Sequence, residues 1–285
     1  MHPSTYETAA HGEIEAWKRP STGWMAKAAA VIDWPLDQAG KALMRTPGLG
    51  RVIERTVGGL VSIANDAAQW SVRRDAIYQD LTRASGYDVR SRADVVRLDL
   101  AAVDRAMGRL ATKYQALALA EGTGTALLGV VGIAPDVVGL VGYNLRAIGE
   151  YGTYCGFELG AESERLFAMH ILALASSPSG ALRGVAMTQL VKIARTVASR
   201  QPWNVLGRHT FATVLERMAR ALGLRLTEAK LGELIPVAGA ALSGGFNAYF
   251  TRKVCDAAYH LYRERFLAEK YGADWITAGP AEQIS

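Results

Sequence analysis

Residues 118–152 read ALAEGTGTALLGVVGIAPDVVGLVGYNLRAIGEYG, an apolar run in which glycine recurs every few positions. A second run of the same kind, residues 231–255, reads LGELIPVAGAALSGGFNAYFTRKVC. Ten of the 29 glycines of the chain lie between residues 122 and 160. Small residues three or four positions apart form one stripe of a helix, along which a second helix can approach closely, and Gly152, Gly156 and Gly160 have this spacing. We therefore predict two glycine-rich helical segments that pack together, line a cavity, or associate as membrane helices do.

Helix signals also dominate the rest of the chain. Ser4 and Glu7 have capping-box spacing before a polar helix that reaches about Lys18, and Ser91 can cap a helix that contains Asp94. Apolar residues at helical spacing predict further helices at about 22–44, 49–70, 75–84, 162–175, 182–197 and 236–271. No stretch alternates apolar and polar residues convincingly, and no Asn-Gly or Asp-Gly hairpin occurs. The predicted fold is a single all-α domain over residues 1–285.

Composition excludes several classes of protein. Half of the 285 residues are apolar and the net charge is only +5, which excludes general disorder. Two cysteines, Cys155 and Cys255, cannot form a disulfide framework or a four-cysteine zinc site. The N-terminal residues lack the apolar run of a secretory signal, so we expect a cytoplasmic protein. The longest uncharged run, residues 234–251, is short for a membrane span and contains Pro236, which favours buried helices over insertion into a bilayer.

Several composite motifs resemble those of the EcsC family. They are Ala-Glu-Gly at residues 120–122, an apolar-Pro-Asp-apolar corner at 133–137, Asn-Leu-Arg-Ala-Ile at 144–148, Tyr-Cys-Gly-Phe at 154–157, Ile-Pro-Val-Ala-Gly-Ala at 235–240 and Phe-Thr-Arg at 250–252. The resemblance extends over about residues 6–272. It implies a helical, bacterial protein whose family is named after a gene beside an ABC transporter, and it implies no catalytic residue.

The sequence contains no recognisable catalytic, cofactor-binding or metal-binding motif. The segment GTGTALLG at residues 122–129 lacks the third glycine of a dinucleotide fingerprint and the Gly-Lys-Ser/Thr of a phosphate loop. Residues 241–245 lack the first glycine of a nucleophile elbow. No histidine pair has metal-ligand spacing, and His170 lies in an apolar helix as core histidines do. We therefore predict no catalytic residue, no cofactor and no metal, although an enzyme acting on lipids remains an alternative.

The polar residues of the two glycine-rich segments are the candidate binding or packing residues. We expect Asp136 to cap a helix that begins at Val137; the alternatives are a polar corner at the mouth of a cavity or pairing with Arg146 or Arg252. Asn144 and Asn247 are expected to hydrogen-bond between helices. The full candidate set is Gly122, Gly124, Pro135, Asp136, Asn144, Arg146, Pro236, Gly239, Gly245, Asn247 and Arg252.

Positive charge is concentrated between residues 183 and 230. This stretch holds nine Lys and Arg and two Glu, a local +7, so the remaining residues sum to +5 − 7 = −2. A basic amphipathic stretch suits an anionic lipid surface, where each cation contributes about 1 kcal/mol. A merely solvated basic face is the alternative, and nucleic acid is not expected because no nucleic-acid-binding motif is present. The candidate membrane-surface residues are Lys192, Arg195, Arg200, Arg208, Arg217 and Arg220.

These observations favour a non-enzymatic helical protein that associates with membranes. Its glycine-rich segments pack together or enclose a lipid-like ligand, and its basic region faces anionic headgroups. We expect it to be cytoplasmic and peripheral on the inner face of the cell membrane. The alternative is an accessory protein that binds an ABC transporter or a secretion system.

Overall fold

A computed structural model describes residues 2–19, 49–66, 72–126, 129–158, 160–177, 180–199, 208–233 and 245–278 of the chain. These residues form helices and contain no strand, which confirms the predicted all-α fold. The helices are α1 (Thr5–Lys18), α3 (Gly50–Asn65), α4 (Arg74–Ser85), α5 (Arg92–Arg97), α6 (Leu100–Met107), α7 (Leu110–Ala126), α8 (Gly129–Tyr154), α9 (Glu162–Ala175), α10 (Gly180–Ala198), α11 (Arg208–Glu233) and α13 (Gly245–Tyr271), followed by the short 3-10 helix η2 (Ala273–Trp275).

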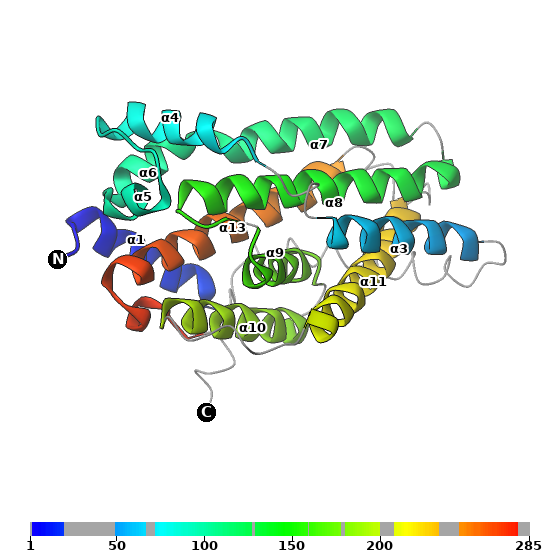
Figure 1. Cartoon of the computed structure of the whole chain (residues 1–285). Helices are drawn as coiled ribbons and strands as arrows, with labels where there is room; N and C mark the ends of the chain where they lie inside the picture. Colours follow the sequence, from blue (N-terminus) through cyan, green and yellow to red (C-terminus); the bar gives the residue numbers. More distant parts are fainter. Residues whose placement is uncertain are drawn as a thin grey trace.

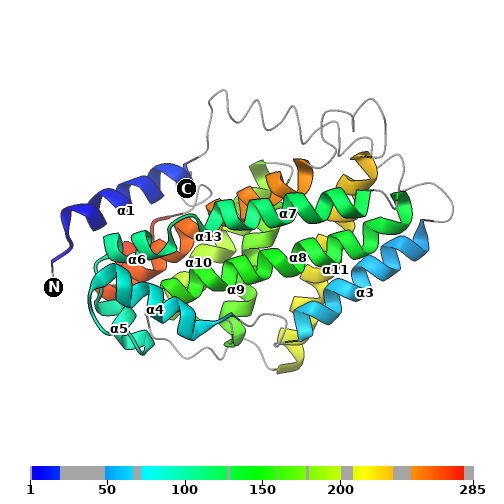
Figure 2. The ribbon, with the colours of Figure 1, turned by 90° about the horizontal axis from the view of Figure 1, so that it is seen from above.

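Three long helices carry the glycine-rich segments and form the centre of the molecule. α7 and α8 run antiparallel along its length, and α13 packs against both (Figures 1 and 2). Close approach depends on missing side chains: a Cβ added to Gly152 of α8 would lie 3.0 Å from the buried Tyr262 ring of α13. The prediction that the glycine-rich segments pack together is therefore confirmed.

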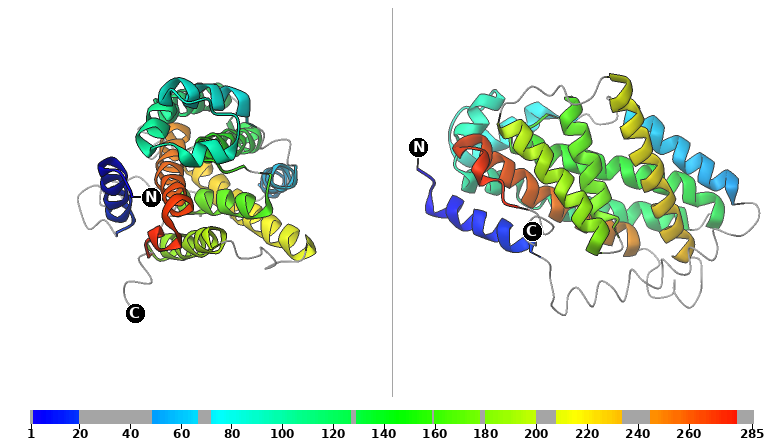
Figure 3. Two further views of the ribbon diagram at one scale, coloured as in Figure 1. Left: turned by 60° about the vertical axis from the view of Figure 1, so that its left-hand side comes forward. Right: turned by 90° about the horizontal axis from the view of Figure 1, so that it is seen from below.

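A second group of helices covers this centre. α9 lies beneath α8 and packs against α10 and α11, and α11 crosses α3 (Figures 1 and 3). The α3–α11 crossing is again close, because Gly223 brings α11 against the side chains of Val57 and Leu60. One continuous apolar core joins these helices to α13.

Helix α1 is attached to α13 largely by ion pairs. Its predicted capping box is present, since Glu7 N–H donates to Ser4 Oγ and Ser4 N–H donates to the Glu7 carboxylate. Glu7 accepts from Lys270 Nζ at 2.7 Å, and Lys18 Nζ lies 2.6 Å from Glu264 Oε2. The N-terminal helix thus closes the fold against the last long helix. The predicted cap on α5 is also present, because Ser91 Oγ accepts from Asp94 N–H.

Three predictions about helix ends are wrong. Pro135 and Asp136 do not form a corner with Asp136 as a cap, because α8 runs through Pro135 without ending. Pro135 has no N–H to donate to the Val131 carbonyl. Val131 and Pro135 both lie on the exposed side of α8, where water can reach that carbonyl. Gly156 and Gly160 do not continue the stripe of Gly152, because α8 ends at Tyr154 and Gly156 adopts a φ of +83° in the following turn. Helix α3 ends at Asn65, whereas the sequence predicts a helix that reaches about residue 70.

Two further predictions concern residues beyond the described ranges: the helix at 22–44 and the start of the last helix near Pro236. Within the part of the chain that the structure describes, no helix has both the length and the apolar content required to cross a membrane.

Candidate functional site

Four polar side chains from four helices meet in the interior, and we call them the interior polar cluster: Glu121 of α7, Asp136 of α8, Lys230 of α11 and Asn247 of α13. Lys230 Nζ lies 2.8 Å from Asp136 Oδ2, and Asn247 Nδ2 donates to Asp136 Oδ1 at 3.0 Å. Both members of the ion pair are buried. The cluster therefore ties α11 and α13 to the middle of α8 through one carboxylate.

Glu121 is the second carboxylate of this cluster. Burial, reinforced by the negative charge of Asp136 and opposed by the positive charge of Lys230, raises its pKa to about 7. A Cβ on Gly139 would collide with the Glu121 carboxylate, so glycine at this position leaves room for it. Glu121 belongs to the Ala-Glu-Gly motif at 120–122, but its place in this cluster is not predictable from the sequence, because no charged residue lies close to it along the chain.

Two turns along α8 from Asp136, Asn144 makes a second polar link to α13. Its Nδ2 donates to Leu140 O at 2.8 Å and to Thr251 Oγ1 at 3.1 Å. The expected hydrogen bonding of Asn144 and Asn247 between helices is thus confirmed. Among the described residues, the Oδ1 atoms of both amides accept no hydrogen bond.

The structure does not bring all of the predicted candidates together. Asp136 pairs with neither Arg146 nor Arg252, which are both exposed, but with Lys230, a residue that we had counted only as part of the basic stretch. Arg146 instead lies 3.8 Å from Glu150 on its own helix. Among the remaining candidates, Pro135 and Gly245 are exposed. Gly122 and Gly124 belong to α7. Pro236 and Gly239 lie outside the described residues.

A separate, apolar groove lies between α9, α10 and α11. It has a volume of about 180 Å³. Its walls are mainly apolar, and the side chains that line it are Met169, His170, Ala173, Ser176, Ser177, Leu182, Val185, Ala186, Gln189, Met218, Ala221, Leu222 and Arg225. The sequence did not predict this groove, because it forms where three helices distant in sequence meet.

Three of these lining residues are polar and make no hydrogen bond or ion pair with any described residue: His170, Gln189 and Arg225. Burial lowers the pKa of His170 to about 4, so its imidazole is neutral at physiological pH. Arg225 is the cation of the groove lining. The groove thus combines apolar walls with a few polar groups that the protein itself does not use, as ligand sites do.

The exposed residues on both sides of this groove form a mixed apolar and basic surface on α10 and α11, the two helices that are seen from below in the right-hand view of Figure 3. Lys192 and Arg217 lie one helical turn from the groove residues Gln189 and Ala221, which places them on the same side of their helices. We define the α10–α11 face as Leu182, Val185, Gln189, Lys192, Arg217, Ala221 and Leu224, all of which are exposed.

The predicted membrane-surface residues only partly belong to this face. Lys192 and Arg217 do, and Arg220 is exposed but paired with Glu216 at 2.9 Å. Arg195 is half-buried, and its Nη2 donates to Ile276 O at 3.3 Å. Arg200 and the side chain of Arg208 lie outside the described residues.

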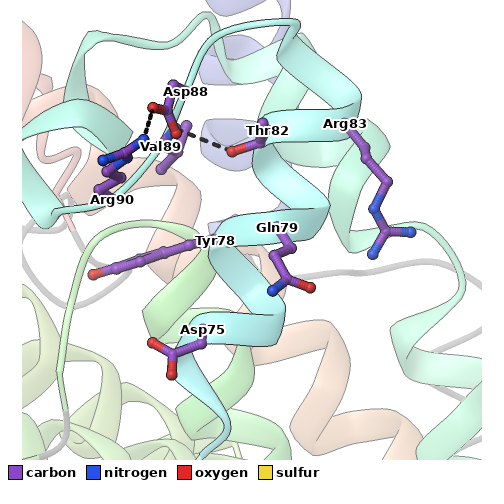
Figure 4. Close-up of a pocket in the computed structure, with 8 residues that line it drawn as sticks. All are labelled: Asp75, Tyr78, Gln79, Thr82, Arg83, Asp88, Val89 and Arg90. Carbon is purple, nitrogen blue, oxygen red and sulfur yellow. Dashed lines mark hydrogen bonds and ion pairs between the residues drawn. The ribbon is translucent and has the colours of Figure 1, made fainter.

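Another hollow, of about 460 Å³, opens beside α4 (Figure 4). Its lining is largely polar, and part of it is paired internally: Arg90 Nη2 lies 2.7 Å from Asp88, and Val89 N–H donates to Thr82 Oγ1. This hollow offers a ligand less apolar wall than the groove does.

The cysteines have the surroundings of unreactive thiols. Both are buried, and burial raises the pKa of Cys255 to about 12 and that of Cys155 well above its ordinary value. In the described ranges, no three His, Cys, Asp or Glu side chains are grouped so that they could hold a metal ion.

Comparison with known proteins gives one match. The model of one family, described as the EcsC protein family, matches residues 9–267. No curated protein and no solved structure matches the chain.

Proposed function

Since this chain belongs to the EcsC protein family, whose description names no reaction, we propose from the geometry of its surface that it binds peripherally to anionic membranes through the α10–α11 face. The observation that carries the proposal is the position of the exposed apolar side chains Leu182, Val185 and Leu224 near the cations Lys192 and Arg217.

Each part of this surface suits one layer of a lipid interface. Exposed apolar side chains gain free energy by leaving water for the boundary between headgroups and acyl chains. Cations beside them are attracted to anionic headgroups, each by about 1 kcal/mol. On α11, Glu216 is the one acidic residue between Arg208 and Arg225, and it is neutralised by Arg220. The face therefore presents positive charge with little opposing charge.

Vesicle co-sedimentation tests the proposal. The protein is expected to sediment with phosphatidylglycerol-containing vesicles and much less with pure phosphatidylcholine. Reversing two cations in K192E/R217E should weaken binding to the anionic vesicles at least about tenfold. The matched control is R97E/R109E, which makes the same change in net charge at exposed positions of α5 and the α6–α7 turn. Equal loss in both double variants would mean that only net charge matters and would refute the assignment to this face.

A second candidate function is that of an accessory protein bound to a membrane-protein partner. It is favoured by exposed apolar side chains near the α7–α8 turn, where Val131 is 74% exposed and Leu117 and Leu119 are each more than 40% exposed. If the wild-type protein binds neither kind of vesicle, this candidate replaces the first. V131D should then weaken binding to the partner, while V185D should not.

A further inference from the structure

The groove between α9, α10 and α11 has the dimensions of a site for one hydrocarbon chain. Its lining residues extend from Met169 of α9 to Ser177 just beyond the end of that helix, from Leu182 to Gln189 on α10 and from Met218 to Arg225 on α11. Each wall thus covers at least eight residues, or about 10 Å of helix. A volume of about 180 Å³ is close to that of an apolar cavity of roughly 150 Å³ that admits benzene, and below the roughly 300 Å³ of larger ligand sites. It accommodates part of one chain and is too small for the two chains of a phospholipid.

The groove continues onto exposed apolar surface. Leu182 and Val185 line it and are 40% and 62% exposed, so a chain longer than the groove would cover them as it emerges. The buried lining, which includes Met169, Ala186 and Leu222, provides the contacts for the enclosed part. A bound chain would remove apolar surface of both parts from contact with water, and this burial is the main source of affinity in such sites.

The polar groups of the groove specify the other end of the ligand. Arg225 has no carboxylate partner among the described residues, and a guanidinium binds carboxylate or phosphate oxygens in a two-pronged geometry. His170 and Gln189 are uncharged and can add hydrogen bonds without repelling an anion. The surrounding α10–α11 face is also basic. Together these features select an anionic headgroup over a cationic one.

We infer that this groove binds a single-chain amphiphile with an anionic headgroup, its chain along the apolar walls and its headgroup at Arg225. The inference rests on the proposed function, since it makes the α10–α11 face the entrance to a lipid site. It adds a ligand class and a position that membrane association alone does not require.

Calorimetric titration with monomeric dodecanoate tests the site, and dodecyltrimethylammonium supplies the same chain with a cationic headgroup. The wild-type protein is expected to bind dodecanoate at least about tenfold more tightly than the cation. R225Q should remove most of this preference, and the exposed R97Q on α5 should leave it unchanged. Equal affinity of the wild-type protein for both amphiphiles would overturn the assignment of Arg225.

A filling variant tests the groove independently of charge. Ala221 lines the groove, whereas Ala212 is equally exposed on the same helix and does not. A221W should weaken binding of dodecanoate at least about tenfold, and A212W should stay within about twofold of the wild-type protein. Matching melting temperatures and helical circular dichroism of the two variants would show that both are folded. Equal affinity of two folded variants would overturn the groove as the site.

Binding to anionic vesicles shows whether the hydrocarbon chain in the groove comes from a bilayer or from solution. It also separates the groove proposal from the proposal of membrane binding. If A221W also binds these vesicles more weakly than A212W, the groove takes a chain end from the bilayer; if only dodecanoate binding falls, it takes a dissolved amphiphile. Vesicle binding without any dodecanoate binding refutes the groove site and leaves the proposed function intact. Dodecanoate binding without vesicle binding refutes the membrane proposal alone.

Discussion

Two neighbouring basic residues at the end of α1 show how strongly burial determines the contribution of an ion pair to the stability of the fold. The Lys18–Glu264 pair is almost completely buried, with both side chains 1% exposed, and Glu264 also accepts from Thr277 N–H and Oγ1. The Arg19–Glu15 pair lies in water, with side chains 61% and 42% exposed. Breaking a buried pair leaves an uncompensated charge, whereas an exposed pair is already screened.

We therefore expect K18Q to lower the free energy of unfolding by about 3 kcal/mol or more. R19Q, its matched control one residue away, should change it by less than about 0.5 kcal/mol. Urea unfolding monitored by circular dichroism measures both values. Similar effects of the two substitutions would show that α1 is not held by its buried lysine.

Glu121 makes stability depend on pH in an unusual direction for a carboxyl group. Burial, reinforced by the charge of Asp136, raises its pKa from 4.5 to about 7 in the folded protein. Between these values the folded state retains a proton that the unfolded state has lost, so its contribution to stability falls as pH rises from about 4.5 to about 7. E121Q should remove this loss and be more stable than the wild-type protein above pH 7, by about 1 kcal/mol because the carboxyl is partly solvent-screened.

Thermal unfolding of both proteins between pH 5 and pH 8 checks this expectation. E54Q is a suitable control, since Glu54 is exposed on α3. A difference between E121Q and the wild-type protein that is the same at every pH would contradict the assigned pKa.

At the scale of the residue, the sequence predicts that the two buried amides bond to a neighbouring helix, but it does not predict which residues the buried charges pair with. Asn144 and Asn247 stand in apolar segments of helices, where few partners for an amide exist apart from neighbouring helices, and both do bond across helices. Lys230 looked like one more cation of a basic stretch, because its carboxylate partner lies on a helix 94 positions earlier. Only the three-dimensional packing identifies that partner.

At the scale of the element, the glycines of α8 differ in what surrounds them. At Gly142 the nearest contact of an added Cβ is Ile63 Cδ1 at 3.9 Å, an ordinary packing distance. At Gly152 the same atom would lie 3.0 to 3.2 Å from the ring of Tyr262, a fully buried side chain. Alanine is favoured over glycine in a helix by about 1 kcal/mol, so the local gain is the same at both positions and packing decides the outcome.

G142A should accordingly stabilise the protein by about 0.5–1 kcal/mol, and G152A should destabilise it by about 1 kcal/mol or more. Each substitution is the control for the other, since both are interior to one helix. Chemical denaturation gives the two values. If G152A were as stabilising as G142A, the close α8–α13 contact would not exist.

Element types were predictable from spacing and caps, whereas several boundaries were not. The capping box of α1 and the Ser91 cap of α5 were evident locally, because the groups involved lie within one turn. Pro135 misled the prediction because proline usually ends a helix, and its tolerance here depends on an exposed position that only the folded arrangement provides. The groove was beyond reach for the same reason: its three walls belong to helices separated by loops and packed by long-range contacts.

At the scale of the whole molecule, charge is divided between two environments with opposite responses to salt. The ion pair Lys18–Glu264 joins α1 to α13 and the ion pair Lys230–Asp136 joins α11 to α8; both are buried, and solvent ions cannot reach them. The excess cations of the α10–α11 face are in water, where the screening length falls from roughly 14 Å to roughly 4 Å between about 0.05 M and about 0.5 M salt.

Raising the salt concentration over this range should therefore separate binding from stability. Binding to anionic vesicles is expected to fall at least about tenfold, because the attraction of the exposed cations to the headgroups is screened. The melting temperature should change by less than about 5 °C, because the buried pairs and the apolar core are not screened in the same way. Co-sedimentation and calorimetry on one preparation measure both. A parallel loss of binding and of stability would mean that salt unfolds the protein, whereas salt-independent binding would mean that apolar contacts alone hold it to the vesicle and that the basic face has no part in the interaction.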